Sequence, residues 1–589
     1  MISLILTLLI ISPFLIFENN DSESYYLTFA YSLILSYGIL GFLGIIFVFL
    51  ELTFLPLYLI LLFIFFILIF SKNYRSKLIY LWYKFTYEIK FINKLEKYKN
   101  TKKFFYLILL LLFVVSIGPI NHSDTANIYV GYPYKFWIEN SHFIDGNLNQ
   151  GLMGIGDFAN IFYFQEKTTW LIRTSQFIPL LILFLYFLKR KINNLYFFIF
   201  LTSPVFIQWL TIGKTNFLSE SCLALTFLVW EKNKNKEYLP YIFSAIFIGV
   251  SFKISAIIVS TPIILYIVFY YRKSLILLKL KNIFNHITLH LLFSIFLLLI
   301  IFSYRYSLIS NPFFPLFSKF FNPGDQQLLD WEQTLRNWDR SGLFPLWIFI
   351  PKTIGKISFV LGPSNLFLII TSMIYFFRNL YFNNARLTVG ISQLILLLVF
   401  AQGRADYYMT PLILVSQGIP SLNINNFRFL NIKLNFNRIL KSFCVITVFL
   451  QFFMFLISSL YSISLVLYVI YDYEGGMNKT AYNFYNSRII AEFSEAPVFS
   501  EITGMTHLYA NIPFVANQKF DRCFYYDENV PPNQKYEACM RREGVRTIVL
   551  EKDKLKNNIN FSCKTQNLIR ASRNIFLEEK LIVDFCKLK

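Results

Sequence analysis

Apolar positions along the first 471 residues gather in long blocks, each bounded by a short polar segment. A helix needs roughly 20 apolar residues to cross a bilayer, and its backbone groups must pair within the segment. The blocks therefore predict about 11 to 14 membrane helices. The apolar runs lie at residues 2–17, 26–49, 54–70, 104–120, 171–188, 195–212, 217–230, 241–254, 257–271, 291–304, 344–377, 389–400, 411–419 and 445–470.

The pattern changes after residue 471, where a polar tail of mixed character begins. Residues 535–542 have helical or loop character, and three short stretches are typical of strands: 496–502, 546–551 and 581–585. We therefore expect a polytopic α-helical membrane domain at residues 1–471. A soluble extracytoplasmic α/β domain should follow at residues 472–589.

Composition narrows the class of protein. Hydrophobic residues make up 56% of the 589 residues and charged residues only 15%, which excludes an ordinary soluble chain. The net charge of +21 does not indicate a nucleic-acid partner, because the basic residues flank apolar runs in short loops. The abundance of Phe, Ile, Lys, Asn and Tyr is typical of an AT-rich bacterial genome. We expect a multi-pass protein of the cytoplasmic (inner) membrane of a bacterium, in contact with the lipid bilayer.

The basic loops also predict which side of the membrane each loop of the chain occupies. Residues 72–103 hold ten Lys or Arg against two Glu, and such loops remain in the cytoplasm. The next apolar run then delivers the loop at 118–170 to the outside. Loops 304–345 and 402–409 and the tail should lie on the same side.

Cysteines give an independent indication of sidedness. Four of the six lie in the tail, at Cys523, Cys539, Cys563 and Cys586. An even number in a compact extracytoplasmic domain predicts two disulfides, with three pairings open. The alternative is four free thiols in a cytoplasmic domain, which the charge distribution disfavours.

The outer loops hold the candidate chemistry. Asp124 follows a membrane run within a few residues, so its carboxylate lies at headgroup depth, suited to a base beside a lipid phosphate. Asp157 is a second candidate carboxylate. Arg305 and Arg404 end helices on the same side, and Lys253 interrupts an apolar run, where a charge is costly unless it faces a cavity. Cations of this kind bind phosphate oxygens. The candidate substrate-binding residues are Asn127, Tyr129, Trp137, Asn311 and Tyr407.

A purely structural interpretation is also open for four of these residues. Asp124 is also compatible with a solvated helix end, and Asp157 with a helix cap. Arg305 and Arg404 are also compatible with interfacial anchors.

The order of these segments resembles the GT-C membrane glycosyltransferases. Asp124, Tyr129, Pro133 and Trp137 resemble the family's first outer loop, with Val130 where a His is usual. The further segments that carry the resemblance are 213–216, with Asn216 where an Asp is usual, 249–253, 310–315 and 404–411. The resemblance spans residues 104–411. It implies inverting transfer of a sugar from a polyprenyl-phosphate donor, with Asp124 as base and Lys253, Arg305 and Arg404 holding phosphate.

The sequence favours a transferase that acts on an extracytoplasmic glycan or lipid acceptor. Two other functions stay open. A polysaccharide polymerase or ligase shares many helices and outer arginines. A transporter or flippase for lipid-linked glycans predicts internal repeats, and no repeat is visible. No cofactor is certain, and a divalent metal, Mg²⁺ or Mn²⁺, is left open.

Overall fold

The computed structural model describes most of the chain. The described residues are 24–50, separate positions between 66 and 90, 99–120, 122, 124–139, 148–163, 176–189, 194–234, 236–275, 289–337, 340, 342–379, 384–401, 403–418, 436–481, 483–501, 512–515, 517–527, 534–555, 558–569 and 580–589. The predicted run at 2–17 and most of the run at 54–70 lie outside them.

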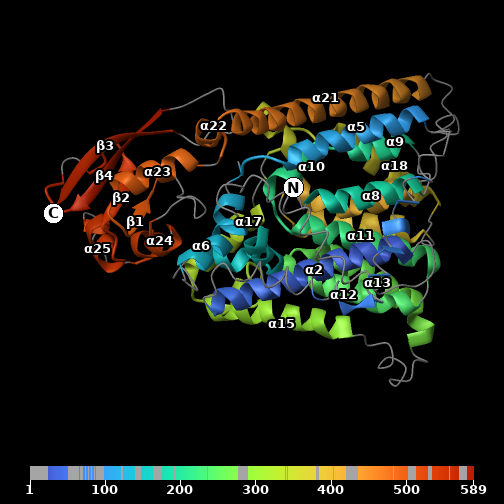
Figure 1. Cartoon of the computed structure of the whole chain (residues 1–589), viewed down its shortest axis with the longest axis horizontal. Coiled ribbons are helices and arrows are strands. Elements are labelled where there is room, and N and C mark those ends of the chain that lie inside the picture. Colours follow the sequence, from blue (N-terminus) through green and yellow to red (C-terminus); the bar gives the residue numbers. More distant parts are fainter. Residues whose placement is uncertain are drawn as a thin grey trace.

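The described part of the first 471 residues is helical, as the long apolar blocks predict (Figure 1). The α-helices are α2 (Ser24–Phe49), α5 (Lys99–Ser116), α6 (Gly131–Glu139), α7 (Ile155–Phe158), α8 (Phe177–Lys189), α9 (Asn194–Leu201), α10 (Val205–Ile212), α11 (Asn216–Asn233), α12 (Leu239–Phe252), α13 (Ala256–Leu275), α15 (Leu289–Ile309), α16 (Ser318–Phe321), α17 (Gln326–Asn337), α18 (Pro363–Asn379), α19 (Ala385–Phe400), α20 (Met409–Gly418) and α21 (Phe436–Tyr471). Short π or 3-10 turns are η3 (Thr125–Tyr129), η4 (Leu148–Leu152), η5 (Ala159–Tyr163), η7 (Lys236–Tyr238), η8 (Leu346–Ile348), η9 (Ile354–Phe359) and η10 (Ala405–Tyr408).

Four helical segments among the described residues are long and apolar enough to cross a membrane. They are Phe29–Phe49, His290–Ile309, Lys356–Phe377 and Ser442–Tyr471, and five shorter apolar helices accompany them. The chain is therefore a multi-pass helical membrane protein with a small C-terminal sheet, as the sequence predicts. The expected total of about 11 to 14 spanning helices stays a prediction.

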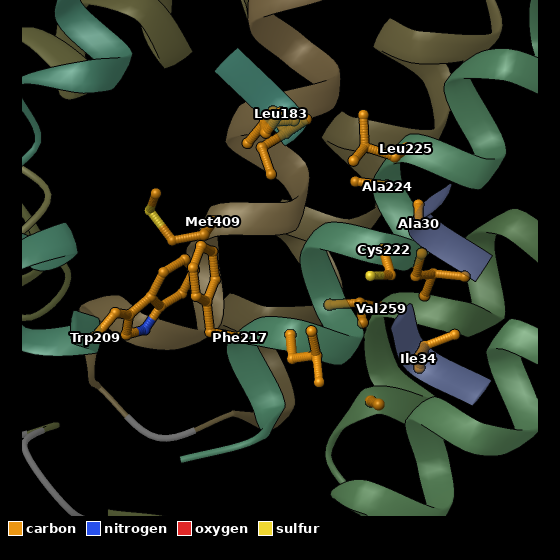
Figure 2. Close-up of a cluster of buried hydrophobic side chains, with 14 of the residues drawn as sticks. Ala30, Ile34, Leu183, Trp209, Phe217, Cys222, Ala224, Leu225, Val259 and Met409 are labelled. Carbon is orange, nitrogen blue, oxygen red and sulfur yellow. The ribbon is translucent and has the colours of Figure 1, made fainter. Parts of the chain in front are cut away.

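Helix α11 lies at the centre of the bundle, where α2, α8, α12, α13, α19 and α20 pack around it. Figure 2 shows part of this core, with Phe217 and Cys222 of α11 among side chains from several of these helices. The rings of Trp209 and Phe217 lie 3.9 Å apart between centroids across the turn that joins α10 to α11. This packing fixes the start of α11, which bears on the site described below.

Glycines let α7 sit directly against two longer helices. A Cβ on Gly41 of α2 would lie 2.1 Å from the Ile155 carbonyl oxygen, and one on Gly154 would lie 1.8 Å from the Phe252 carbonyl oxygen. Both distances are below any normal contact, so only glycine leaves room for these backbones to touch. The close approach brings α7 beside the end of α12.

The tail forms a four-stranded sheet with the order β1-β2-β4-β3. The strands are β1 (Val498–Ser500), β2 (Thr547–Glu551), β3 (Phe561–Ile569) and β4 (Lys580–Leu588), and the helices are α22 (Tyr473–Thr480), α23 (Phe484–Phe493), α24 (Asn517–Tyr526) and α25 (Lys535–Arg542). Strands β1 and β2 are parallel, and the other neighbours are antiparallel. Side chains alternate across β2, so that Ile548 and Val549 enter separate apolar clusters. The predicted α/β fold is confirmed.

Two disulfides stabilise the tail. Cys523 of α24 pairs with Cys539 of α25, and Cys563 pairs with Cys586 directly across β3 and β4. The other two cysteines, Cys222 and Cys444, are buried thiols in helices of the membrane domain. The structure thus selects one of the three pairings that the sequence left open.

The tail contacts two loops of the helical domain at one end of the bundle (Figure 1). Arg522 of α24 donates hydrogen bonds to Asp325, at 2.6 Å, and to the Gln327 side chain, at 2.9 Å. The Lys135 ammonium of α6 lies 3.7 Å from the centre of the Phe514 ring. The C-terminal domain therefore bridges the loop after α5 and the loop after α15.

Candidate active site

Asp124 begins a tight turn that follows α5. The next five residues form the π-turn η3, and π-turns occur frequently at functional sites. Two hydrogen bonds hold this turn in place: the Thr125 hydroxyl donates to the Ile212 carbonyl, and the Asn160 amide donates to the Tyr129 carbonyl at 2.8 Å. Asp124 is therefore fixed relative to the end of α10.

Four charged side chains from three loops meet around Asp124, and we call them the charged cluster: Asp124, Lys214, Arg404 and Asp406. The Asp124 carboxylate lies 3.3 Å from Lys214 Nζ and 3.5 Å from an Arg404 guanidinium nitrogen. Asp406 lies 3.5 Å from Arg404 and 4.0 Å from Lys214. Each cation is shared between two carboxylates at distances longer than a tight ion pair, so the contacts leave room for exchange of partners.

A second layer lies behind the cluster, centred on the Tyr129 ring. The Lys214 and Lys253 ammonium groups each lie 4.9 Å from the ring centre, and Lys253 Nζ also donates to the Tyr129 hydroxyl oxygen at 2.8 Å. Aromatic faces attract cations. The ring therefore helps to hold two like-charged lysines near one another, which raises the local density of positive charge.

Asp157 forms the third layer. Its carboxylate accepts hydrogen bonds from the Gly154 backbone N–H, at 2.9 Å, and from the Thr215 hydroxyl, at 3.0 Å. Thr215 directly follows Lys214, so Asp157 supports the turn that carries a cation of the charged cluster. This arrangement suits a positioning role as well as it suits a second acid or base.

Charge and burial shift the pKa values of the two carboxyl groups, Asp124 and Asp157, in opposite directions. Burial alone would raise the pKa of Asp124, but the charges of Lys214, His122 and Arg404 outweigh it and hold the pKa well below its usual value. Burial raises the pKa of Asp157 to about 6, against the opposing effect of the hydrogen bond from Gly154. Burial also lowers the pKa of the Lys253 ammonium to about 7, with repulsion from Lys214 as the next cause. Asp124 is thus an ionised but weak base until its cations are engaged elsewhere.

The predicted site residues divide into two groups. Asp124, Tyr129, Lys253 and Arg404 come together, and the Asn127 Oδ1 is buried nearby without a hydrogen-bond donor among the described residues. Tyr407 lies between Arg404 and the start of α20 and interacts electrostatically with Asp124. The side chain of Trp137 lies outside the described residues.

Arg305 and Asn311 make other contacts. The Arg305 side chain is fully buried and donates to the backbone carbonyls of Gly151 and Met153, both at 3.1 Å. The Asn311 amide donates to the Leu316 carbonyl at 2.9 Å, and its oxygen accepts from the Phe313 N–H at 3.0 Å. Both side chains therefore hold the local backbone, and the structure places neither in the charged cluster.

Lys214 and Asp406 belong to the cluster although sequence reasoning assigned them no role. The turn around Lys214 was part of the family-like pattern, and that pattern was the available signal. For Asp406 the signal was its position two residues after Arg404. Among the described residues, no group of three or more His, Cys, Asp or Glu gathers in a way that could hold a metal ion. A divalent metal stays an open option.

The fold and the site together define a multi-pass helical membrane protein with a largely buried charged cluster and a C-terminal domain that contains two disulfides. No protein-family model matches the chain, and no curated protein matches its sequence. Among solved structures it is similar to the crystal structure of ArnT from Cupriavidus metallidurans in the apo state, at 12% identity and a TM-score of 0.40, over 82% of this chain and 97% of that chain. Values this low do not establish a shared activity.

Proposed function

We propose that this protein is a GT-C-type membrane glycosyltransferase. It moves a sugar from a polyprenyl-phosphate donor to a glycan or lipid acceptor outside the cytoplasmic membrane. One observation carries the proposal: Lys214 and Arg404 both lie within 3.5 Å of the carboxylate of Asp124, at the end of a membrane helix bundle. This geometry combines a base with phosphate-binding cations in one place.

The charged cluster suggests how donor binding activates the base. A phosphate group competes with Asp124 for Lys214 and Arg404, because both cations bind phosphate oxygens readily. Once those cations turn to the phosphate, the pKa of Asp124 rises toward its ordinary value. The carboxylate then becomes a better proton acceptor only when the donor is in place.

The transfer step balances without a further reactant. The acceptor hydroxyl gives its proton to Asp124 while its oxygen bonds to the anomeric carbon of the donor sugar. The bond from that carbon to the phosphate oxygen breaks, and its electron pair leaves on the phosphate. Lys214, Lys253 and Arg404 stabilise the added negative charge. A single displacement inverts the configuration at the anomeric carbon.

The test separates the base from the phosphate site. Asp124→Asn should lower transfer from a polyprenyl-phosphate sugar by about 10²–10⁴-fold, because proton acceptance is lost. Binding of polyprenyl phosphate itself, followed by native mass spectrometry in nanodiscs, should persist or strengthen, since Lys214 and Arg404 lose a competitor.

Asp521→Asn in the C-terminal domain is a matched control, expected to leave transfer and binding unchanged. Full transfer by Asp124→Asn would refute the assigned base. Loss of phosphate binding by the same variant would refute the competition between Asp124 and the donor.

A further inference from the structure

A rigid loop follows α15 on the side of the C-terminal domain. Asn311 hydrogen-bonds to the backbone of residues 313 and 316, and the Asn322 amide donates to the Ile309 carbonyl at 3.0 Å. The Glu332 carboxylate of α17 accepts from the Ser318 N–H at 2.7 Å. Hydrogen bonds at both ends and in the middle therefore fix the conformation of residues 310–322.

This fixed loop displays four phenylalanines, which we call the aromatic ridge: Phe313, Phe317, Phe320 and Phe321. The Phe313 ring lies 6.0 Å from Phe317 and 5.8 Å from Phe321, between centroids, and Phe320 lies 5.1 Å from Phe321. Phe317 is 60% exposed and Phe320 is 80% exposed. Rings exposed to this degree on a fixed loop need a partner that is itself apolar.

The ridge continues the lipid-facing surface of α15. Its Phe313 ring lies 5.0 Å from Phe302 of that helix, and Leu299 and Tyr306 of α15 are largely exposed. The segment His290–Ile309 is long enough to cross a bilayer, and only 33% of its apolar stretch is buried inside the protein. Exposed apolar side chains thus follow one another from a helix that can span the membrane onto the adjoining loop, and the solvent that suits such side chains beside a spanning helix is lipid.

A cation lies within the ridge. Lys319 is exposed between Phe317 and Phe320, at a point where its long side chain can reach from apolar surroundings toward water. Phenylalanines beside a lysine are typical of segments that lie in the membrane interface, where the rings enter the acyl region and the ammonium stays among the headgroups. In residues 317–320, the phenylalanines therefore suit the acyl region of one leaflet, and Lys319 suits its headgroup region.

We propose that the aromatic ridge inserts into the bilayer leaflet on the side of the C-terminal domain, with Lys319 bound to the phosphate of an anionic phospholipid. The anchor lies outside the spanning helices and does not depend on the proposed transfer activity. It also has a consequence for the site, because Arg305 of the same helix holds the Gly151 and Met153 carbonyls of the turn that leads into α7. The ridge thereby sets the depth of Asp157 and the charged cluster relative to the headgroups.

Spin labelling of the full chain in vesicles tests the insertion. Labels at Phe320→Cys and Phe317→Cys should collide with dissolved oxygen severalfold more often than with a water-soluble nickel complex. The matched control is Tyr525→Cys, on the exposed face of α24, which should show the opposite preference. The native chain, whose two free thiols are buried, gives the labelling background.

Equal access of the nickel complex to positions 320 and 525 would overturn the insertion. A label at 320 shielded from both reagents would also overturn it, because a protein partner would then cover the ridge.

A second measurement tests the headgroup contact. In vesicles that contain phosphatidylglycerol, Lys319→Glu should move the label at 320 toward water. In phosphatidylcholine alone, the same substitution should produce a smaller shift. Indistinguishable shifts in the two lipids would overturn the role of anionic phosphate at Lys319.

Discussion

Ionic contacts lie at both ends of the neighbouring helices α11 and α19, and the two ends differ in geometry. At one end, Arg386 donates two hydrogen bonds to a single Glu231 oxygen, at 2.6 and 2.8 Å, and a third to the Gln417 carbonyl. At the other end, Lys214 precedes α11 and Arg404 follows α19, and each is shared between carboxylates at 3.3 to 4.0 Å. The same two helices thus hold one tight pair and one loose cluster.

The difference indicates how to tell a structural ion pair from a binding site. Arg386 directs two of its N–H groups at one Glu231 oxygen and a third at the Gln417 carbonyl, so an exchange of partners would break short hydrogen bonds. In the charged cluster, two cations and two carboxylates satisfy one another only partly. An incoming anion can replace a carboxylate there without leaving a buried charge uncompensated.

The largest expected effect is a loss of stability when the pair of Glu231 and Arg386 is broken. Glu231→Ala should lower the free energy of unfolding by about 3 kcal/mol, because the partly buried guanidinium of Arg386 loses the carboxylate that accepts two of its hydrogen bonds. Asp124→Asn should lower the same free energy by a smaller amount, because the Asp406 carboxylate still lies 4.0 Å from Lys214 and 3.5 Å from Arg404 and compensates both cations. Thermal or denaturant unfolding in detergent measures both. A greater loss of stability for Asp124→Asn than for Glu231→Ala would reverse the contrast between the two ends.

The next effect concerns ligand binding. Arg404→Ala should weaken binding of polyprenyl phosphate by about 10- to 150-fold, the usual value of a hydrogen bond to a charged group. The matched control is Arg386→Ala, at the opposite end of α19, which should leave the affinity of the folded fraction unchanged. Titration in nanodiscs gives both constants. Equal losses of affinity in the two variants would show that the cluster acts on the fold and not on the ligand.

A pH profile sharpens the contrast further. Because burial lowers the pKa of Lys253 to about 7, this ammonium is protonated below neutrality and loses its charge as pH rises through about 7. Affinity for polyprenyl phosphate should therefore fall as pH rises through this range, by at most about tenfold per pH unit for one linked proton. Lys253→Arg should flatten the profile, since arginine stays charged. A profile that Lys253→Arg leaves unchanged would assign the titration to another group.

The smallest effect is expected at a third ion pair, between Arg522 and Asp325, which joins the C-terminal domain to the start of α17. The Arg522 side chain is 51% exposed, so water screens this pair far more than the other two. A double-mutant cycle with Arg522→Ala and Asp325→Ala should give a coupling energy of about 0–1 kcal/mol. A coupling above that range would mean that the contact between the domains is itself a principal source of stability.

Sequence reasoning located the loops of the site but not all of its members. Asp124 and Arg404 stand out because each follows an apolar run on the same predicted side. Lys214 becomes a partner of Asp124 only when α10 and α11 fold against η3, and no local pattern reports that contact. Arg305 shows the converse, because a buried arginine that holds backbone carbonyls looks, in sequence, the same as one that faces a phosphate.

In the C-terminal domain, too, some elements could be predicted from the sequence and others could not. Three of the four strands follow from the apolar pattern, and residues 535–542, which the pattern left as helix or loop, form helix α25. Strand β3 was missed because its sequence is largely polar, as befits an edge strand with an exposed face. The pairing of Cys563 with Cys586 depends on the β3–β4 register, so it could not be chosen without that strand.

Gly154 has a consequence for engineering the site. Because its Cα lies against the Phe252 carbonyl, the spacing between Asp157 on α7 and Lys253 at the end of α12 is set by two main chains in contact. A library that randomises positions 124, 253 and 404 changes charge and hydrogen bonding while this spacing stays constant. Randomising position 154 instead alters the spacing itself, so the two kinds of change can be varied independently.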